Sequence, residues 1–310
     1  MKRFLLRVCL FLILMPLGWA VLFAMAMMNY GIESRFIAQE RNWGFVNAKS
    51  LEWSQLRHST SFDVLAFGSS TCYSGIDPRA FQVRDINLFN FCSSSQSIPH
   101  SLPLIEAAFE DQTPEVLLLD VYPAFWDKEA VSSEPVRDWI VNGNLWDTHW
   151  AKAYGKLTLS SHAPFAWMTM LYYPFRRMLS PAGKNAPEDP NGMYKGQGFV
   201  FRTFPALSDV PSDEPMDVNM SNSVSTALIR IVDLCESKDV KLMLVNPPQL
   251  VEEVFDPSTF AGDFIWIDGN KWPGAKTPSN FYDDHHLVGE GAQRYSEWLS
   301  LQVAQIQKVP

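Results

Sequence analysis

The stretch FDVLAFGSST, residues 62–71, decides the fold of this chain. An apolar run of strand length, Phe62 to Phe67, ends at Gly68 and is followed by three hydroxyl-bearing residues. A strand that is apolar on both faces is typical of a parallel sheet covered by helices on both sides. The stretch therefore predicts a buried strand and a sharp turn that presents a hydroxyl group at the carboxyl end of that strand.

Predicted strands and helices alternate along the rest of the chain. Further apolar runs predict strands over 86–91, 116–121 and 240–245. Apolar residues at helical spacing predict helices over 102–109, 224–235 and 291–307. Strands that alternate with helices favour an α/β fold, with three α/β/α layers around a parallel sheet of flavodoxin-like type. Ligands of such sheets bind beyond the carboxyl ends of the strands.

The N-terminal segment carries three basic residues and then a long uncharged run: Lys2, Arg3 and Arg7, followed by residues 8–28. The run is long enough to cross a bilayer as a helix, and the basic residues before it place the N-terminus in the cytoplasm. The small residues Ala24 and Ala26 also fit a signal-peptide cleavage site. Residues 1–29 are thus a transmembrane anchor or a signal peptide. Either way we expect an extracytoplasmic domain, held by a single pass at the inner membrane of a bacterium.

The rest of the chain divides by composition. Residues 30–60 are predicted as a connector, 61–125 and 222–310 as one α/β domain, and 126–221 as an insertion or cap. Five tryptophans lie in the insertion: Trp126, Trp139, Trp146, Trp150 and Trp167. They are expected either to line a groove for sugar rings or to pack in the core.

Composition limits the classes of function. The 310 residues are 47% hydrophobic and 19% charged, which excludes disorder for most of the chain. The formal net charge of −9 excludes a domain-wide basic surface for nucleic acid. The four cysteines have no C-x-x-C spacing. Cys72 and Cys92 are either small core residues or, in an exported domain, a bonded pair.

A second polar cluster, YDDHHL at 282–287, precedes the last predicted helix. A serine nucleophile needs an imidazole to take its proton and a carboxylate to orient that imidazole. An Asp three residues before a His supplies both groups. Alternatively, Ser69, Ser70 or Thr71 caps a helix, and the second cluster is a solvated acidic loop or a metal site. Four ligands on the consecutive residues 283–286 cannot all converge on one ion, so we expect no metal and no cofactor.

The two clusters together resemble the SGNH/GDSL hydrolase superfamily. The matching blocks are Phe67-Gly68-Ser69-Ser70 and Asp283-x-x-His286-Leu287. The resemblance implies Ser70 as nucleophile, His286 as base and Asp283 as its partner. SGIDP at 74–78 and the closing segment 283–296 look like the membrane-anchored, cell-envelope branch of that superfamily.

This resemblance implies an extracytoplasmic serine O-acyltransferase or esterase. Its substrates would be O-acyl groups, first of all acetyl, on a cell-envelope polysaccharide, and a membrane-bound O-acyltransferase would be its partner. A non-catalytic accessory protein that binds the polysaccharide or that partner is the alternative.

The oxyanion-binding groups depart from the superfamily pattern. Ser95 stands where a glycine is usual, and with Gly68 and Asn90 it is expected to bind the oxyanion or substrate. The Gly-x-Asn-Asp block is missing, since Asp120-Val121-Tyr122-Pro123 follows the third predicted strand. Loss of one such donor typically costs about 10²–10³ in turnover. This pattern favours a slow or specialised acyl transfer over a fast general esterase.

Overall fold

A computed structural model describes residues 1–29, 44–122, 133–143, 145, 147–160, 192–211, 220–251, 257–260 and 262–307. Its centre is a five-stranded sheet in the order β2-β1-β3-β4-β5, in which every pair is parallel. The strands are β1 (Val64–Phe67), β2 (Leu88–Asn90), β3 (Val116–Asp120), β4 (Lys241–Asn246) and β5 (Ile265–Asp268). The predicted α/β class with a parallel sheet is confirmed, and its strand order is that of flavodoxin-like folds.

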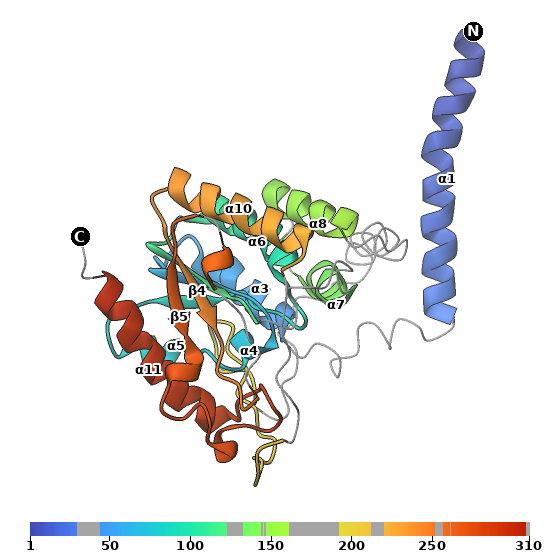
Figure 1. The fold of residues 1–310 in the computed structure, drawn as a ribbon. Helices are drawn as coiled ribbons and strands as arrows, with labels where there is room; N and C mark the ends of the chain where they lie inside the picture. The colour runs from blue at the N-terminus through green and yellow to red at the C-terminus, as the bar shows by residue number, and fades with distance from the viewer. Residues whose placement is uncertain are drawn as a thin grey trace.

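Helices cover both faces of this sheet (Figure 1). One side carries α3 (Val46–Leu56), α6 (Ile98–Asp111), α8 (Thr148–Ser160) and α10 (Asn222–Ser237). The other carries α4 (Ser70–Tyr73), α5 (Pro78–Gln82) and α11 (Gly289–Gln307). Shorter elements are α7 (Ser133–Arg137), the π-helix η3 (Asp138–Asn142) and the 3-10 turns η5 (Pro257–Thr259), η6 (Gly269–Lys271) and η7 (Pro278–Asn280).

The apolar strands divide their side chains between two cores. Leu65, Leu117 and Leu244 belong to the core under α6 and α10, whereas Ala66 and Leu118 belong to the core under α11. All are fully buried. Because successive strand residues point to opposite faces, only a strand that is apolar at every position fills both cores. This is why the continuous apolar runs indicated a covered sheet.

Two elements of the α/β domain, β5 and α3, are among those that lie outside the strands and helices predicted from the sequence. The edge strand β5 is only four residues long; Ile265, Trp266 and Ile267 are apolar, but of these only Ile267 is buried. Helix α3 falls within 30–60, the predicted connector, yet its Val46 and Trp53 are fully buried in the core. Residues 46–56 therefore pack as part of the α/β domain.

The described tryptophans of the region 126–221 are core residues. Trp139 and Trp150 are fully buried, and both rings pack against Phe91, which follows β2. Trp53 of α3 packs against Phe91 from its own side. These rings do not form a sugar-binding groove, because no face of them is exposed. Trp126, Trp146 and Trp167 lie outside the described residues.

The carboxylate of Asp111, at the end of α6, ties this aromatic cluster together. It accepts hydrogen bonds from the indole N–H groups of Trp53 at 2.7 Å and Trp150 at 2.8 Å. Arg57 Nη1 donates to it at 2.9 Å, and His149 Nε2 lies 2.8 Å away. Helices α3, α6 and α8 thus meet at one buried acidic group.

Helix α1 (Lys2–Asn29) stands apart from this domain (Figure 1). Its apolar span Lys2–Leu22 has a mean hydropathy of 2.3, and none of it is buried. An apolar helix with no covering cannot stay in water at low cost. It could be a membrane anchor or a signal sequence, as the sequence predicted.

Candidate active site

The turn after β1 is built around Gly68. Its backbone adopts φ +150°, and a Cβ atom at this position would collide with the side chain of Asp120 at the end of β3. Only glycine lets the ends of β1 and β3 approach this closely. Gly68 therefore shapes the turn, and its carbonyl accepts a hydrogen bond from the Ser93 N–H at 3.1 Å.

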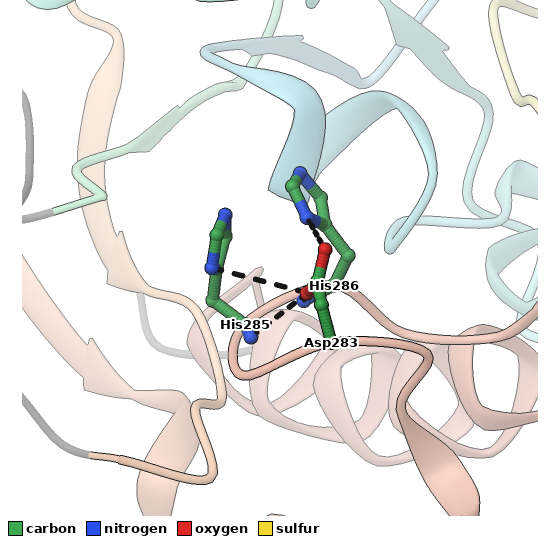
Figure 2. Close-up of side chains that lie close together, drawn as sticks. All are labelled: Asp283, His285 and His286. Atoms are coloured by element: carbon green, nitrogen blue, oxygen red, sulfur yellow. Dashed lines mark hydrogen bonds and ion pairs between the residues drawn. The ribbon is translucent and has the colours of Figure 1, made fainter. Parts of the chain in front are cut away.

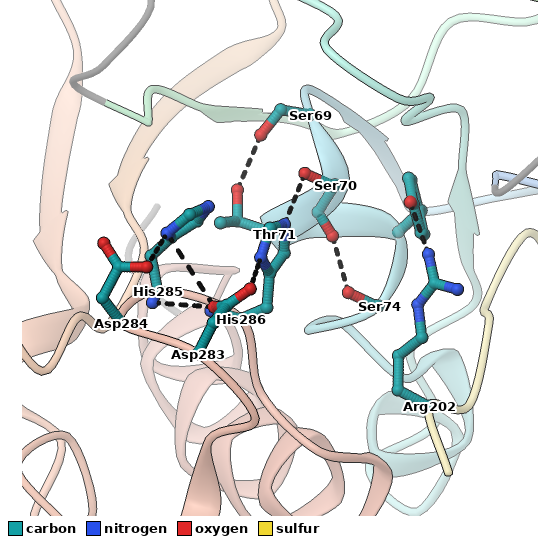
Figure 3. A network of polar contacts seen from close by, with 10 residues as sticks. Ser69, Ser70, Thr71, Ser74, Arg202, Asp283, Asp284, His285 and His286 are labelled. Carbon is teal, nitrogen blue, oxygen red and sulfur yellow. Dashed lines mark hydrogen bonds and ion pairs between the residues drawn. The ribbon is translucent and has the colours of Figure 1, made fainter. Parts of the chain in front are cut away.

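The three hydroxyl groups of the turn point in two directions (Figure 3). Thr71 Oγ1 donates to the Asp120 carboxylate at 2.5 Å, and Ser69 Oγ lies 3.3 Å from the same oxygen. Ser70 instead faces the loop before α11. The resemblance implied Ser70 rather than its neighbours, and the start of α4 at Ser70 turns its side chain away from Asp120.

Ser70, His286 and Asp283 form a continuous chain of hydrogen bonds. Ser70 Oγ lies 2.7 Å from His286 Nε2, and His286 Nδ1 lies 2.8 Å from Asp283 Oδ2 (Figure 3). These residues come from two segments 216 positions apart. The structure thus brings together the three residues expected to be catalytic, in the order of nucleophile, base and orienting carboxylate.

The electrostatic setting keeps His286 neutral and Asp283 charged. Burial lowers the pKa of His286 below its ordinary 6.5, and this effect outweighs the hydrogen bond that His286 donates to Asp283, which favours the charged ring. Burial alone would raise the pKa of Asp283, but the hydrogen bond from His286 and the nearby ring charges lower it to about 2. A neutral imidazole beside an ionised carboxylate is the state that a general base requires.

The loop that carries this pair is held in a fixed shape. Asp283 Oδ1 accepts the backbone N–H groups of His285 at 3.1 Å and His286 at 2.6 Å. Phe281 and Leu287 on either side pair in an antiparallel bridge and are buried. The ring of Tyr282 stacks on His286 with a 5.3 Å centroid separation and a 6° interplanar angle. The imidazole is therefore restrained from several sides.

The neighbouring pair, Asp284 and His285, makes its own hydrogen bond. His285 Nδ1 lies 2.8 Å from Asp284 Oδ1, and its ring lies 4.0 Å from that of His286, centroid to centroid. Figure 2 shows the two rings rising side by side from the loop. The resemblance implied that Asp283 is the partner of His286, and the structure pairs Asp283 with His286 and Asp284 with His285.

The same loop raises the question of a metal. Ligand atoms of Asp283, His285 and His286 lie within 4.8 Å of one another, so three of the four residues do converge. However, His286 uses Nδ1 for Asp283 and Nε2 for Ser70, which leaves no lone pair for an ion. The hydrogen bonding at this loop is that of a serine–histidine–aspartate site, and chelation would test the metal reading directly.

Ser95 lies on a loop that is fixed beside the nucleophile turn. Cys72 of α4 and Cys92 are joined by a disulfide, and Ser93 N–H bonds to Gly68 as described. Ser95 itself has φ 54°, the left-handed region that favours glycine. This conformation agrees with the position of Ser95, where the superfamily has glycine. The backbone N–H of Ser95 stays our predicted oxyanion donor.

The side chain of Asn90 was expected to bind the oxyanion or substrate, but it is not placed to do so. It is fully buried; its amide nitrogen donates to the carbonyls of Cys72 at 3.1 Å and Ile76 at 3.4 Å, and its oxygen accepts the Cys92 N–H at 3.0 Å. The side chain braces α4 against the segment after β2, so no group is left for a substrate. The spacing of residues placed Asn90 near the site, but not the direction of its side chain.

Three residues near the site, Tyr73, Arg202 and Phe204, were not predicted from the sequence. Arg202 Nη2 donates to Tyr73 Oη at 2.5 Å, and its positive charge adds to the lowering of the His286 pKa. The half-exposed Phe204 packs on Tyr282 at 4.9 Å. Arg202 and Phe204 belong to residues 192–211, within the predicted insertion, and nothing in their sequence marks them.

A comparison with protein-family models finds no matching family, and a comparison with curated proteins finds no matching sequence. The fold and the site therefore define a class of protein only. It is an α/β protein with a five-stranded parallel sheet, a separate apolar N-terminal helix and a buried aromatic cluster.

Proposed function

We propose that this protein is an exported SGNH-type serine acyl-transfer enzyme. It acts on O-acyl groups, first of all acetyl, of a cell-envelope polysaccharide, and passes the acyl group through Ser70 to a sugar hydroxyl or to water. The observation that carries the proposal is the hydrogen-bonded chain from Ser70 Oγ through His286 to Asp283.

The first half-reaction follows from this chain. His286 Nε2 takes the proton of Ser70 while Ser70 Oγ attacks the acyl carbonyl. Asp283 holds the Nδ1–H tautomer and stabilises the imidazolium that forms. His286 then gives the proton to the leaving oxygen, and the acyl group remains on Ser70.

The second half-reaction reverses these roles. His286 takes a proton from the acceptor hydroxyl, whose oxygen attacks the acyl carbon, and the bond to Ser70 Oγ breaks. Backbone N–H groups of Ser70 and Ser95 are the proposed donors to the oxyanion. The backbone N–H of Ser95 survives its replacement of a glycine, so this donor is retained.

The polymer and partner assignments rest on the N-terminal helix, the net charge and the resemblance. Helix α1 offers a means of holding the domain at a membrane, where a membrane-bound O-acyltransferase would supply acyl groups. The acidic chain, with a net charge of −9, suits a neutral or weakly charged polysaccharide better than an anionic polymer. The resemblance of segments 74–78 and 283–296 to the envelope branch points to the same substrate class.

A serine-reactive fluorophosphonate probe, followed by peptide mapping, tests the proposal. Ser70→Ala is expected to abolish labelling, and Asp283→Asn to slow it by about 10³–10⁴-fold because the tautomer of His286 is lost. Ser69→Ala is the matched control, since its hydroxyl faces Asp120, and it is expected to retain labelling. Polymer acylation that survives Ser70→Ala in cells would support the non-catalytic accessory protein instead.

A further inference from the structure

The hydrogen-bonded chain of Ser70, His286 and Asp283 does not include the side chain of His285. Its ring lies between Tyr122, on which it stacks at 4.7 Å and 16°, and the ring of His286. Its backbone N–H is held by Asp283 and its Nδ1 by Asp284. A side chain restrained by a carboxylate and by rings on two sides is a preorganised group rather than a solvated loop residue.

The bond to Asp284 decides which nitrogen of His285 is available. A carboxylate accepts hydrogen bonds, so the neutral ring carries its proton on Nδ1 and presents the lone pair of Nε2. No hydrogen-bond partner of this Nε2 lies among the residues that the structure describes. Figure 2 shows that the rings of His285 and His286 extend from the loop in the same direction. Two imidazole acceptors thus stand side by side at the nucleophile.

We propose that His285 binds the acyl acceptor and selects a vicinal diol, such as that of a sugar ring, over an acceptor with a single hydroxyl group. This inference rests on the proposed function, because it assigns a second contact to the acceptor of the same half-reaction. Once Ser70 is acylated, its oxygen has no proton to donate, and His286 Nε2 is free for the attacking hydroxyl. His285 Nε2 accepts a hydrogen bond from the hydroxyl on the neighbouring carbon.

The balance of the step is that of ordinary acyl transfer. The attacking oxygen forms a bond to the acyl carbon and its proton passes to His286 Nε2. The bond between the acyl carbon and Ser70 Oγ breaks, and the proton moves from His286 to Ser70 Oγ. His285 gains and loses no proton. A diol places a separate hydroxyl group on each ring, whereas a mono-alcohol has one hydroxyl proton and can donate to His286 alone, so the second contact favours the diol as acceptor.

Partition of the acyl-enzyme tests this role. The full-length protein in detergent is given p-nitrophenyl acetate with either propane-1,2-diol or propan-1-ol, and the ester and acetate products are quantified by chromatography. The wild type is expected to prefer the diol. His285→Phe, which keeps a ring between Tyr122 and His286, is expected to lower this preference about 5–10-fold, the worth of one hydrogen bond. His285→Gln, which keeps a polar group, is expected to retain part of it.

Two results would overturn the inference: a wild type without preference for the diol, or an unchanged preference in both His285 variants. A proportional loss of transfer and hydrolysis also counts against it, since that result marks a residue that only supports the fold. Release of p-nitrophenol and its loss in Ser70→Ala report separately on the proposed function. A serine-dependent esterase that shows no effect of His285 would therefore leave that function standing and remove this inference alone.

Discussion

At the scale of single residues, the site depends on which groups carry a proton. His286 contacts Ser70 and Asp283 with its two nitrogens, and its ring is stacked under Tyr282. Burial makes the charged ring unfavourable there, while Asp283 remains ionised. The base is thus poised to accept a proton only when a substrate reacts.

A pH profile of kcat/KM tests this state of His286. Because its pKa lies below 6.5, the neutral base persists below that pH, and activity is lost only as the pH falls through the lowered pKa. The carboxylate of Asp283, with a pKa of about 2, stays charged throughout this range. We expect the acid limb of the profile at a pH below 6.5. An acid limb centred above 6.5 would contradict the buried, neutral imidazole.

At the scale of elements, the disulfide joins the helix of the nucleophile to the loop of Ser95. Cys72 and Cys92 are 20 residues apart and flank β2 and α5. Lys49 of α3 donates to the carbonyl of Cys92 and holds the same loop from its other side. Removal of the disulfide therefore gives the unfolded chain more conformational freedom. It also loosens the loop that carries Ser95, the proposed oxyanion donor.

We expect the double substitution Cys72→Ala and Cys92→Ala to lower the free energy of unfolding by about 3 kcal/mol. Urea denaturation followed by tryptophan fluorescence measures this loss. Dithiothreitol should shift the wild type toward the variant and leave the variant unchanged, which separates the bond from the two side chains. Equal midpoints for the oxidised wild type and the variant would show that the cross-link does not stabilise the domain.

A second prediction at the scale of elements concerns the carboxylate of Asp111. Its side chain is only 2% exposed and has four partners from α3 and α8 or their ends, one of which is Arg57 Nη1. Replacement by alanine leaves those partners without an acceptor, and we expect a loss of about 3–5 kcal/mol in unfolding free energy.

Asp147→Ala is the matched control for this site. Asp147 pairs with the same Arg57 at 2.5 Å, but its side chain is 45% exposed. An exposed ion pair contributes about 0–1 kcal/mol, so only a small change is expected in the same denaturation experiment. A similar loss for both variants would mean that the effect comes from Arg57 rather than from the buried carboxylate.

At the scale of the whole molecule, the domain and the N-terminal helix are separable. None of the apolar span of α1 is buried, while the core of the sheet is complete without it. We expect deletion of residues 1–29 to yield a soluble protein that reacts with the fluorophosphonate probe at the wild-type rate. Size-exclusion chromatography and labelling measure both properties. Aggregation of the truncated protein, or slower labelling at Ser70, would show that α1 contributes to the domain.

Much of this architecture could be predicted, because patterns of neighbouring residues in the sequence determine it. The continuous apolar runs of β1, β3 and β4 indicated a covered parallel sheet, and Gly68 indicated the turn after the first strand. The edge strand β5 was not predicted, because its apolar run, residues 264–267, is too short for periodicity to assign it. Residues 30–60 had helical potential, but the packing of α3 in the core was not predicted, because its buried residues include the polar Lys49 and Ser50 beside Val46 and Trp53.

The sequence alone determined the order of the central strands β1 to β4 and the helices α6, α10 and α11, the apolar N-terminal helix and the residue types available for acyl transfer. Only the tertiary structure decided that Ser70, and not Ser69 or Thr71, faces His286, and that Cys72 meets Cys92. Hydrophobic patterns act between neighbours in the chain, so they are visible in the sequence. A contact between residues 216 positions apart depends on strand order and register, which arise when distant segments pack together.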